Sequence, residues 1–305
     1  MKLNIATCQF SVDRDIRRNY RSIVRQIQAA KKQGAHVVHF PELALSGYAG
    51  VEFDSYKDFD WKMQEECLRG VLDTARRQRM WVILGATHRL TGRRKPHNSL
   101  YIIDDRGRII DRYDKLFCAG DRNGKTGDLV HYSPGSHFSI FTIRRVKCAV
   151  LICHDFRYPE LYREYKRKGA QLMFHSYHNG HATDDRAKQA RHDVERRYRN
   201  LNHGDNVWGI TVAATMQSQA ANNYMWISCN NTSAKESFWP SFFVRPDGII
   251  TGRLKLNQAG VLLSTMDPQQ KYYDASIAWR DRAMRGFHHS GTTVRDRRSQ
   301  LRTIL

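Results

Sequence analysis

Three ionisable side chains stand at the ends of predicted strands, and their chemistry is complementary. Glu42 and Lys115 each come two residues after such a strand, and Cys153 directly follows the apolar run Val146–Ile152. The ends of strands are where α/β proteins place their sites. A free thiol has a pKa of about 8.5 and needs a base or a cation nearby to attack at neutral pH. The three residues therefore predict a thiol nucleophile with a carboxylate base and an ammonium partner.

The hydrophobic pattern predicts the elements that must position these residues. Alternating residues over Lys2–Phe10 precede a helical spacing from Ile16 to Ala30, and a second apolar helix face covers Trp61–Gln78. The other expected elements are the strands Ala35–Phe40, Trp81–Ala86, Ser99–Ile103, Arg108–Tyr113, Phe138–Ile143, Val146–Ile152, Leu172–His175, Trp208–Ala214 and Gly260–Met266, and the helices Pro159–Lys168 and Asp184–Asn202. Strands and helices alternate at first and hairpins follow, so we expect an α/β protein with a mixed sheet system covered by helices.

Length and composition favour one large domain of an enzyme-like size. The chain has 305 residues, of which 41% are hydrophobic, enough for a substantial core. No stretch approaches the roughly 20 apolar residues of a membrane span, and no leader pattern opens the sequence, so we expect a cytoplasmic protein without a membrane partner. The six cysteines form no C-x-x-C pair, which predicts reduced thiols.

The strong positive charge raises a different hypothesis. The formal net charge is +20, with 50 Lys and Arg against 30 Asp and Glu, and such a balance favours anionic partners. A nucleic-acid footprint requires basic residues clustered with aromatics or within a known module. Here the excess is spread over Arg14–Arg25, Arg76–Arg79, Arg163–Lys168, Arg191–Arg199 and Arg295–Arg302, so solvated helix faces are expected rather than a specific nucleic-acid site.

Three sequence blocks carry a resemblance to a known family. They are H-F-P-E-L-A-L-S-G at His39–Gly47, D-R-Y-D-K-L at Asp111–Leu116 and L-I-C-H-D-F-R-Y-P-E-L-Y at Leu151–Tyr162. In this order and at these distances they closely resemble the signature blocks of the nitrilase superfamily, the carbon-nitrogen hydrolases. The resemblance runs from about Lys2 to Met266.

The resemblance implies an architecture and an assembly. The fold would be a four-layer α-β-β-α sandwich, with residues 1–267 forming the carbon-nitrogen hydrolase domain. Residues 268–305 would form a C-terminal arm at the interface of a homodimer or a larger homo-oligomer. Neither a metal nor an organic cofactor is required.

The resemblance also implies a reaction. Glu42 would act as general base, Cys153 would form a thioester with the acyl group, and Lys115 would stabilise the oxyanion. The sequence Cys153-His154-Asp155 is similar to that of the amidase and N-carbamoyl amidohydrolase branch, which favours a linear amide or N-carbamoyl substrate and release of ammonia or an amine. Two alternatives stay open: acyl transfer to an amine on the same fold, and a basic nucleic-acid-binding protein with a vestigial site.

Six residues are predicted to bind the substrate. Asp128 stands where many amidase-type members have a second glutamate, although an alignment slip within 118–131 would remove that match. The other candidates are Tyr48, His154, Arg157, His178 and Asn179. Arg157 could hold a substrate carboxylate or a structural ion pair, and Tyr48 could be a packing residue. The spacing His175-x-x-His178-x-x-His181 is compatible with a metal site, but a substrate-facing loop is expected there.

Overall fold

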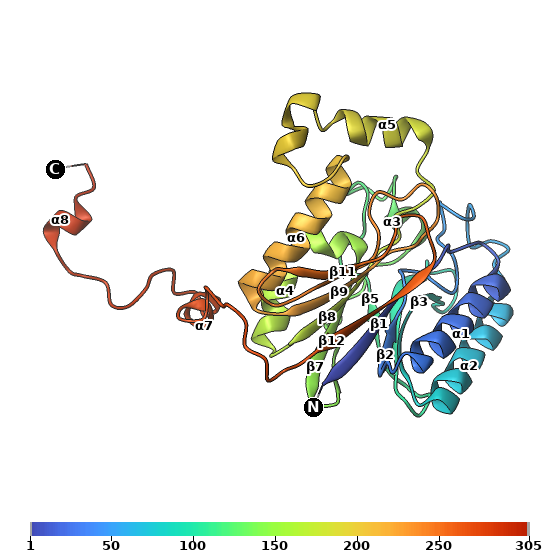
Figure 1. The fold of residues 1–305 in the computed structure, drawn as a ribbon. Helices are drawn as coiled ribbons and strands as arrows, with labels where there is room; N and C mark the ends of the chain where they lie inside the picture. Colours follow the sequence, from blue (N-terminus) through green and yellow to red (C-terminus); the bar gives the residue numbers. More distant parts are fainter. Residues whose placement is uncertain (1, 304–305) are drawn as a thin grey trace.

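The computed structural model describes residues 2–303, whose strands form two six-stranded sheets (Figure 1). The first sheet has the order β12–β1–β2–β3–β4–β5, with β1 (Leu3–Gln9), β2 (Val37–His39), β3 (Trp81–His88), β4 (His97–Ile103), β5 (Ile109–Asp114) and β12 (Gly260–Met266). The second has the order β11–β10–β9–β8–β7–β6, with β6 (Ile140–Ile143), β7 (Val146–Ile152), β8 (Leu172–Ser176), β9 (Trp226–Asn230), β10 (Phe242–Val244) and β11 (Ile250–Arg253). The central strands of each sheet, β1–β2–β3 and β7–β8–β9, are parallel.

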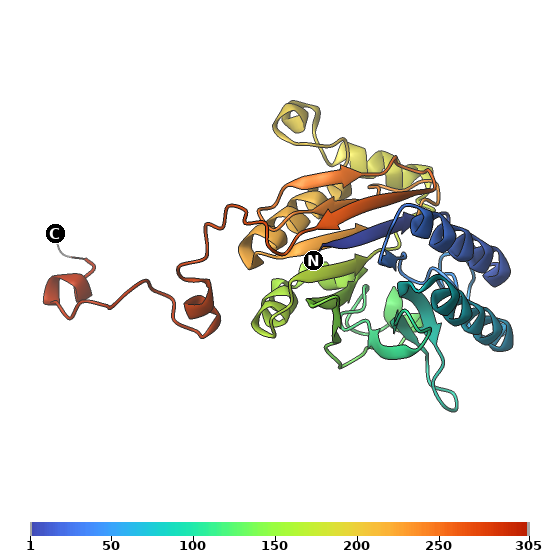
Figure 2. The same ribbon diagram turned by 60° about the horizontal axis from the view of Figure 1, so that its bottom comes forward.

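Helices cover the outer face of each sheet, which confirms the expected α-β-β-α sandwich (Figures 1 and 2). The first sheet packs against α1 (Ile16–Lys32) and α2 (Trp61–Gln78), and the second against α4 (Pro159–Arg167) and α6 (Val207–Asn223). The inner faces of the two sheets share one apolar core, in which Ile5 and Ile83 belong to the first sheet and Val150 and Ile227 to the second. The shorter helices are α3 (Asp128–His131), α5 (Asp184–His192), α7 (Arg280–Met284), α8 (Arg297–Gln300) and the 3₁₀ turns η1 (Cys153–Arg157) and η2 (Arg196–Leu201).

Two expected elements were wrong. The apolar run Trp208–Ala214, counted as a strand, is the first half of helix α6, because Asn206 caps the helix by accepting the N–H of Gly209. The buried residues of α6 then recur at helical spacing rather than alternating. The helix expected over Asp184–Asn202 is interrupted after His192 and resumes only as the 3₁₀ turn η2.

A buried polar network joins the two sheets behind the site. His39, at the end of β2, lies 2.9 Å through Nδ1 from the hydroxyl of Ser228 and 2.8 Å through Nε2 from that of Ser176, both on the opposite sheet. The Ser228 hydroxyl is also 2.7 Å from that of Thr7 on β1. Burial lowers the pKa of His39 well below its ordinary value, so the ring is neutral and serves as a hydrogen-bonding link. The network fixes where β2 ends, three residues before Glu42.

The C-terminal segment leaves the sandwich after β12 and extends away from it (Figures 1 and 2). It is anchored where Tyr272 N–H donates to the Tyr224 hydroxyl at 3.0 Å, and it exposes apolar side chains such as Tyr273 and Trp279. The domain boundary at 267 and the interface role of the arm stay predictions. Within residues 2–303, no helix combines the length and apolarity that crossing a bilayer demands.

Replacing Ser228 with Ala should lower the free energy of unfolding by about 1–3 kcal/mol, because it leaves buried groups of His39 and Thr7 without a partner. Urea unfolding followed by circular dichroism measures the loss. Ser55→Ala is the matched control, since the exposed Ser55 hydroxyl makes one contact at 3.4 Å, and it should stay within about 0.5 kcal/mol of the parent protein. Equal effects of the two substitutions would contradict a linking role for the network.

Candidate active site

Three charged side chains from separate elements meet beneath the ends of the strands. Lys115, just after β5, places Nζ 2.8 Å from Glu42 Oε1 and 2.7 Å from Asp128 Oδ2. Glu42 comes from the loop after β2 and Asp128 from the start of α3. All three side chains are at most 3% exposed. The structure therefore brings the predicted carboxylate and ammonium together and adds Asp128 to them.

The charges of this cluster stabilise each other. Burial alone lowers the pKa of Lys115, but Asp128 and Glu42 outweigh it and hold the pKa well above its ordinary value. Burial alone raises the pKa of Asp128, yet Lys115 brings it below its usual range. Asn98, on β4, donates its side-chain N–H to Glu42 Oε1 at 2.7 Å. The charged form of the ammonium is thus favoured, and it lies between two carboxylates.

Cys153 occupies the sharp turn that follows β7. Its φ of +40° lies in the left-handed region, which a non-glycine residue adopts at a cost and which clusters at functional sites. Burial and the Glu42 carboxylate raise the pKa of the thiol, while Lys115 and the backbone amide of His178 lower it. The net shift is upward, so Cys153 is a thiol at rest and needs a base to become a nucleophile.

Two residues without a predicted role hold this turn. Asp155 accepts the N–H of Ile152 at 3.0 Å, the N–H of Phe117 at 2.8 Å and the hydroxyl of Tyr113 at 2.8 Å. Asp155 therefore connects the turn that carries Cys153 to the segment that carries Lys115.

The second residue that holds the Cys153 turn is His175, near the end of β8. Its Nε2 lies 3.1 Å from the carbonyl oxygen of Cys153, and its Nδ1 lies 2.5 Å from the Tyr162 hydroxyl. Burial lowers the pKa of His175 to about 3, so the ring is neutral. The aspartate two residues after the cysteine was a signal in the sequence, but the partners of both residues lie on distant segments that no spacing predicts.

A cavity of about 500 Å³ opens over the cysteine. Its walls include all six predicted substrate-binding residues, Asp128, Tyr48, His154, Arg157, His178 and Asn179, together with Cys153. Aromatic side chains of Phe156, Trp208 and Trp239 line it as well. Glu42 and Lys115 are not among the lining residues, and their side chains are at most 1% exposed.

The six candidates differ in what already binds them. The Tyr48 hydroxyl donates to Asp128 Oδ1, and the N–H of Ala119 donates to Asp128 Oδ2 at 2.8 Å. Asn179 is committed to the fold, since its Oδ1 accepts the N–H of Phe238 at 2.8 Å. His154 is half-buried, with Nε2 3.5 Å from the Tyr158 hydroxyl.

Arg157 has no structural ion pair in the part of the chain that is described. Its guanidinium carbon lies 4.4 Å from the ring centre of Phe156 and 5.6 Å from that of Trp208. The side chain is stacked but its charge is not matched by a carboxylate. This leaves the guanidinium free to meet an anionic group in the cavity.

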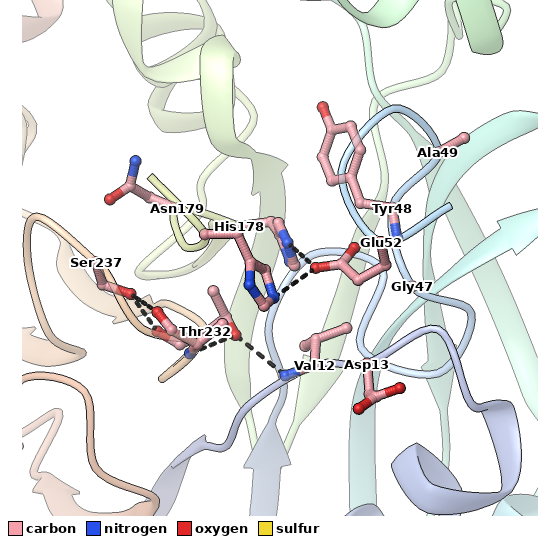
Figure 3. Close-up of polar contacts among 12 residues, drawn as sticks. Val12, Asp13, Gly47, Tyr48, Ala49, Glu52, His178, Asn179, Thr232 and Ser237 are labelled. Carbon is pink, nitrogen blue, oxygen red and sulfur yellow. Dashed lines mark hydrogen bonds and ion pairs between the residues drawn. The ribbon is translucent and has the colours of Figure 1, made fainter. Parts of the chain in front are cut away.

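The three histidines with metal-like spacing do not share one set of partners. His175 binds Tyr162 and the Cys153 carbonyl. His178 lies 2.8 Å from Glu52 (Figure 3), and His181 approaches the same carboxylate at 3.4 Å. Across residues 2–303 no three His, Cys, Asp or Glu side chains come together as a metal site would require. Glu52 was not predicted from the sequence, because nothing in its neighbourhood indicates that its carboxylate is buried.

The fold and this geometry define an α/β sandwich with a cysteine, a carboxylate and an ammonium at its strand ends. The family model described as carbon-nitrogen hydrolase matches residues 4–272. The chain therefore belongs to the carbon-nitrogen hydrolase family, and the resemblance of the three sequence blocks is confirmed.

Comparison with individual proteins gives more distant matches. The chain is 29% identical over 182 residues to the 2-oxoglutaramate amidase of Bacillus subtilis (strain 168), covering 57% of this chain and 64% of that protein. It is 27% identical over 175 residues to an omega-amidase of Xenopus tropicalis, covering 56% and 62%. It matches about half to just under two thirds of the length of the curated relatives. A crystal structure of an amidase from Nesterenkonia sp. has the same fold, with a TM-score of 0.69 at 18% identity over 93% of this chain and 96% of the other.

Acidification should stabilise the parent protein relative to an Asp155→Asn variant. Burial raises the pKa of Asp155 from 3.8 to about 6. The folded protein therefore takes up a proton there between about pH 6 and pH 4, where the unfolded chain does not, and the contribution of Asp155 to stability grows as the pH falls. From pH 7 to pH 5 the difference in unfolding free energy between the two proteins should shift by about 1 kcal/mol in favour of the parent. Urea unfolding at both pH values measures it, and a constant difference would contradict the shift.

Proposed function

We propose that this protein hydrolyses the carbon-nitrogen bond of a small linear amide or N-carbamoyl compound through a thioester on Cys153. The observation that carries the proposal is the buried Lys115, held 2.8 Å from Glu42 and 2.7 Å from Asp128, of which Asp128 shares the wall of one cavity with Cys153. A carboxylate that can accept a proton and a fixed cation are the two groups that a resting thiol needs beside it.

In the first half-reaction, Glu42 takes the proton of the Cys153 thiol as the sulfur bonds to the substrate carbonyl carbon. The carbonyl oxygen becomes an oxyanion, which Lys115 and a backbone N–H of the turn stabilise; losing one such donor costs about 3 kcal/mol or more. The carbon-nitrogen bond then breaks, Glu42 returns the proton to the leaving nitrogen, and ammonia or an amine departs.

In the second half-reaction, Glu42 removes a proton from water, which attacks the thioester carbonyl. The carbon-sulfur bond breaks, and Cys153 recovers its proton as the acid product leaves. Asp128 keeps Lys115 oriented while Glu42 twice takes up and releases a proton.

The names of similar proteins support the amide as substrate. The relatives include a 2-oxoglutaramate amidase and omega-amidases. One Nesterenkonia amidase variant carries the acetamide moiety of fluoroacetamide covalently on its active-site cysteine, and another is bound to butyramide. Acyl transfer to an amine is the second candidate, since a thioester reacts with amines as well as with water. Hydroxylamine trapping, read as hydroxamate formed at the expense of acid, distinguishes the two.

Replacing Cys153 with Ala should lower the rate of ammonia release by about 10³-fold or more, because no other group can form the acyl-enzyme. An enzymatic ammonia assay on a panel of linear amides measures this, and intact-mass spectrometry should find an acyl adduct on the parent protein. Cys118→Ala is the control: this thiol lies three residues from Lys115 but outside the cavity lining, and its loss should change the rate less than about three-fold. Unchanged turnover of Cys153→Ala would refute the proposal.

A further inference from the structure

The carboxylate of the proposed base is held through one oxygen only. Glu42 Oε1 accepts two hydrogen bonds, from Lys115 Nζ at 2.8 Å and from the side-chain amide of Asn98 at 2.7 Å. Glu42 Oε2 is buried and has no hydrogen-bond partner among residues 2–303. Buried polar atoms nearly always have a partner, and an exception at an active site calls for a role. The two oxygens of this carboxylate are therefore in different states.

Asn98 connects the proposed base to the ammonium through two different groups. Its side chain donates to Glu42, while its backbone carbonyl oxygen accepts the N–H of Lys115 at 2.9 Å. Its backbone is fixed by the sheet, because Asn98 on β4 pairs with Thr87 on β3. The side chain is fully buried and is not part of the cavity lining. Any effect of Asn98 on the reaction would therefore pass through Glu42 and Lys115.

The orientation of the Asn98 amide is set by Glu42. The amide oxygen Oδ1 is buried without a hydrogen-bond partner in the described part of the chain, while the amide N–H meets the carboxylate. Turning the amide over would place Oδ1 against Glu42 Oε1, and two acceptors repel each other. The donor is also uncharged. It therefore orients the carboxylate without adding a second cation, which would oppose transfer of a proton to Glu42.

Lys115 alone does not determine which oxygen of Glu42 meets the thiol. An ammonium is a compact charge on a flexible stem, and its donors rotate, so either carboxylate oxygen can satisfy it. The Asn98 N–H is a directional donor on a strand. Burial raises the pKa of the Cys153 thiol most and Glu42 raises it further, which places the carboxylate within electrostatic reach of the sulfur. With both donors on Oε1, Oε2 is the oxygen left to take a proton.

We propose that Asn98 is a positioning residue, which holds Oε1 of Glu42 so that Oε2 takes the proton of the Cys153 thiol. The S–H bond breaks and an O–H bond forms on Oε2 as the sulfur bonds to the substrate carbonyl carbon. The hydrogen bonds to Oε1 stay in place during this transfer. The inference rests on the proposed role of Glu42 as base, and it adds which atom acts and which residue orients it.

Alkylation of Cys153 by iodoacetamide tests the inference without turnover of an amide. The sulfur bonds to the methylene carbon, iodide leaves, and the thiol proton must be removed. Asn98→Leu keeps about the same side-chain size without the donor, and it should slow this alkylation at pH 7 by about 10- to 100-fold, the worth of one hydrogen bond to a charged group. Intact-mass spectrometry over time measures the rate, and Cys153→Ala gives the background from the other cysteines. Asn98→Ala removes the same donor without bulk and serves if Asn98→Leu folds poorly.

Asn223→Leu is the matched control. Asn223 is 1% exposed, its Nδ2 donates to the Gln219 carbonyl oxygen at 2.9 Å within α6, and its Oδ1 also lacks a partner between residues 2 and 303. This variant should slow alkylation by less than about three-fold. Equal slowing in both variants would mean a general loss of structure. No slowing in Asn98→Leu would mean that Glu42 is oriented without Asn98, and either result would overturn the inference.

Steady-state kinetics separate this inference from the proposed reaction. Where the parent protein hydrolyses an amide, Asn98→Leu should lower kcat by about 10- to 100-fold and change KM by less than about three-fold, because Asn98 is outside the cavity lining. A loss confined to KM would overturn the inference. If the parent protein hydrolyses no amide but alkylation slows in Asn98→Leu and not in Asn223→Leu, the reaction fails and the inference stands. Equal alkylation of the parent protein and Asn98→Leu would overturn the inference even where hydrolysis is found.

Discussion

The structure depends on one buried ammonium shared by two carboxylates. Lys115 is 1% exposed, and an isolated charge at that depth would lose its proton or unfold the site. Glu42 and Asp128 keep it charged, but two carboxylates and one ammonium leave the cluster with one net negative charge. Removing one partner of such a buried pair typically costs about 3–5 kcal/mol. The contacts that fix the geometry of the site therefore also stabilise the fold around it.

The negative charge of the cluster explains how the proposed nucleophile can be both unreactive at rest and reactive with substrate. Burial is the largest cause that raises the pKa of Cys153, and Glu42 and Asp128 raise it further, so a thiolate beside these carboxylates is unfavourable. When the proton moves from Cys153 to Glu42, the thiolate appears and one carboxylate is neutralised. The total charge near Lys115 is unchanged. Proton transfer within the site therefore avoids the cost that ionisation of the thiol to solvent would carry.

The sequence predicted the strands that end at the charged residues better than it predicted the cavity around them. Glu42 and Cys153 each follow a strand with an apolar run, whereas Lys115 follows β5, in which charged residues interrupt the apolar ones; all three strands are present in the fold. The first half of helix α6 was predicted as a strand, because its residues are mostly apolar. The helical spacing of its buried residues is seen only over the full length of the helix. The domain boundary at 267 and the oligomeric state depend on contacts that one folded chain does not contain.

The site residues that could not be predicted from the sequence are held by hydrogen bonds between segments that lie far apart in the chain. Asp155 acts through Phe117 and Tyr113, His175 through Tyr162, and neither set is periodic along the chain. Nothing in the sequence distinguishes Glu52, whose carboxylate is 3% exposed, from the exposed acids that follow it. Whether a single charged side chain is buried depends on how distant segments pack around it, and neither composition nor residue spacing predicts that packing.

One loop joins two buried ion pairs. The segment that begins at Glu42 and ends at Glu52 carries the proposed base at one end and the partner of His178 at the other. It passes so close to Gly85 on β3 that a Cβ there would overlap the Pro41 carbonyl and the Leu43 N–H. In its middle, Tyr48 gives its backbone N–H to Glu52 and its hydroxyl to Asp128. Tyr48 therefore links the Glu52 end of the loop to Asp128, one of the two carboxylates that hold Lys115.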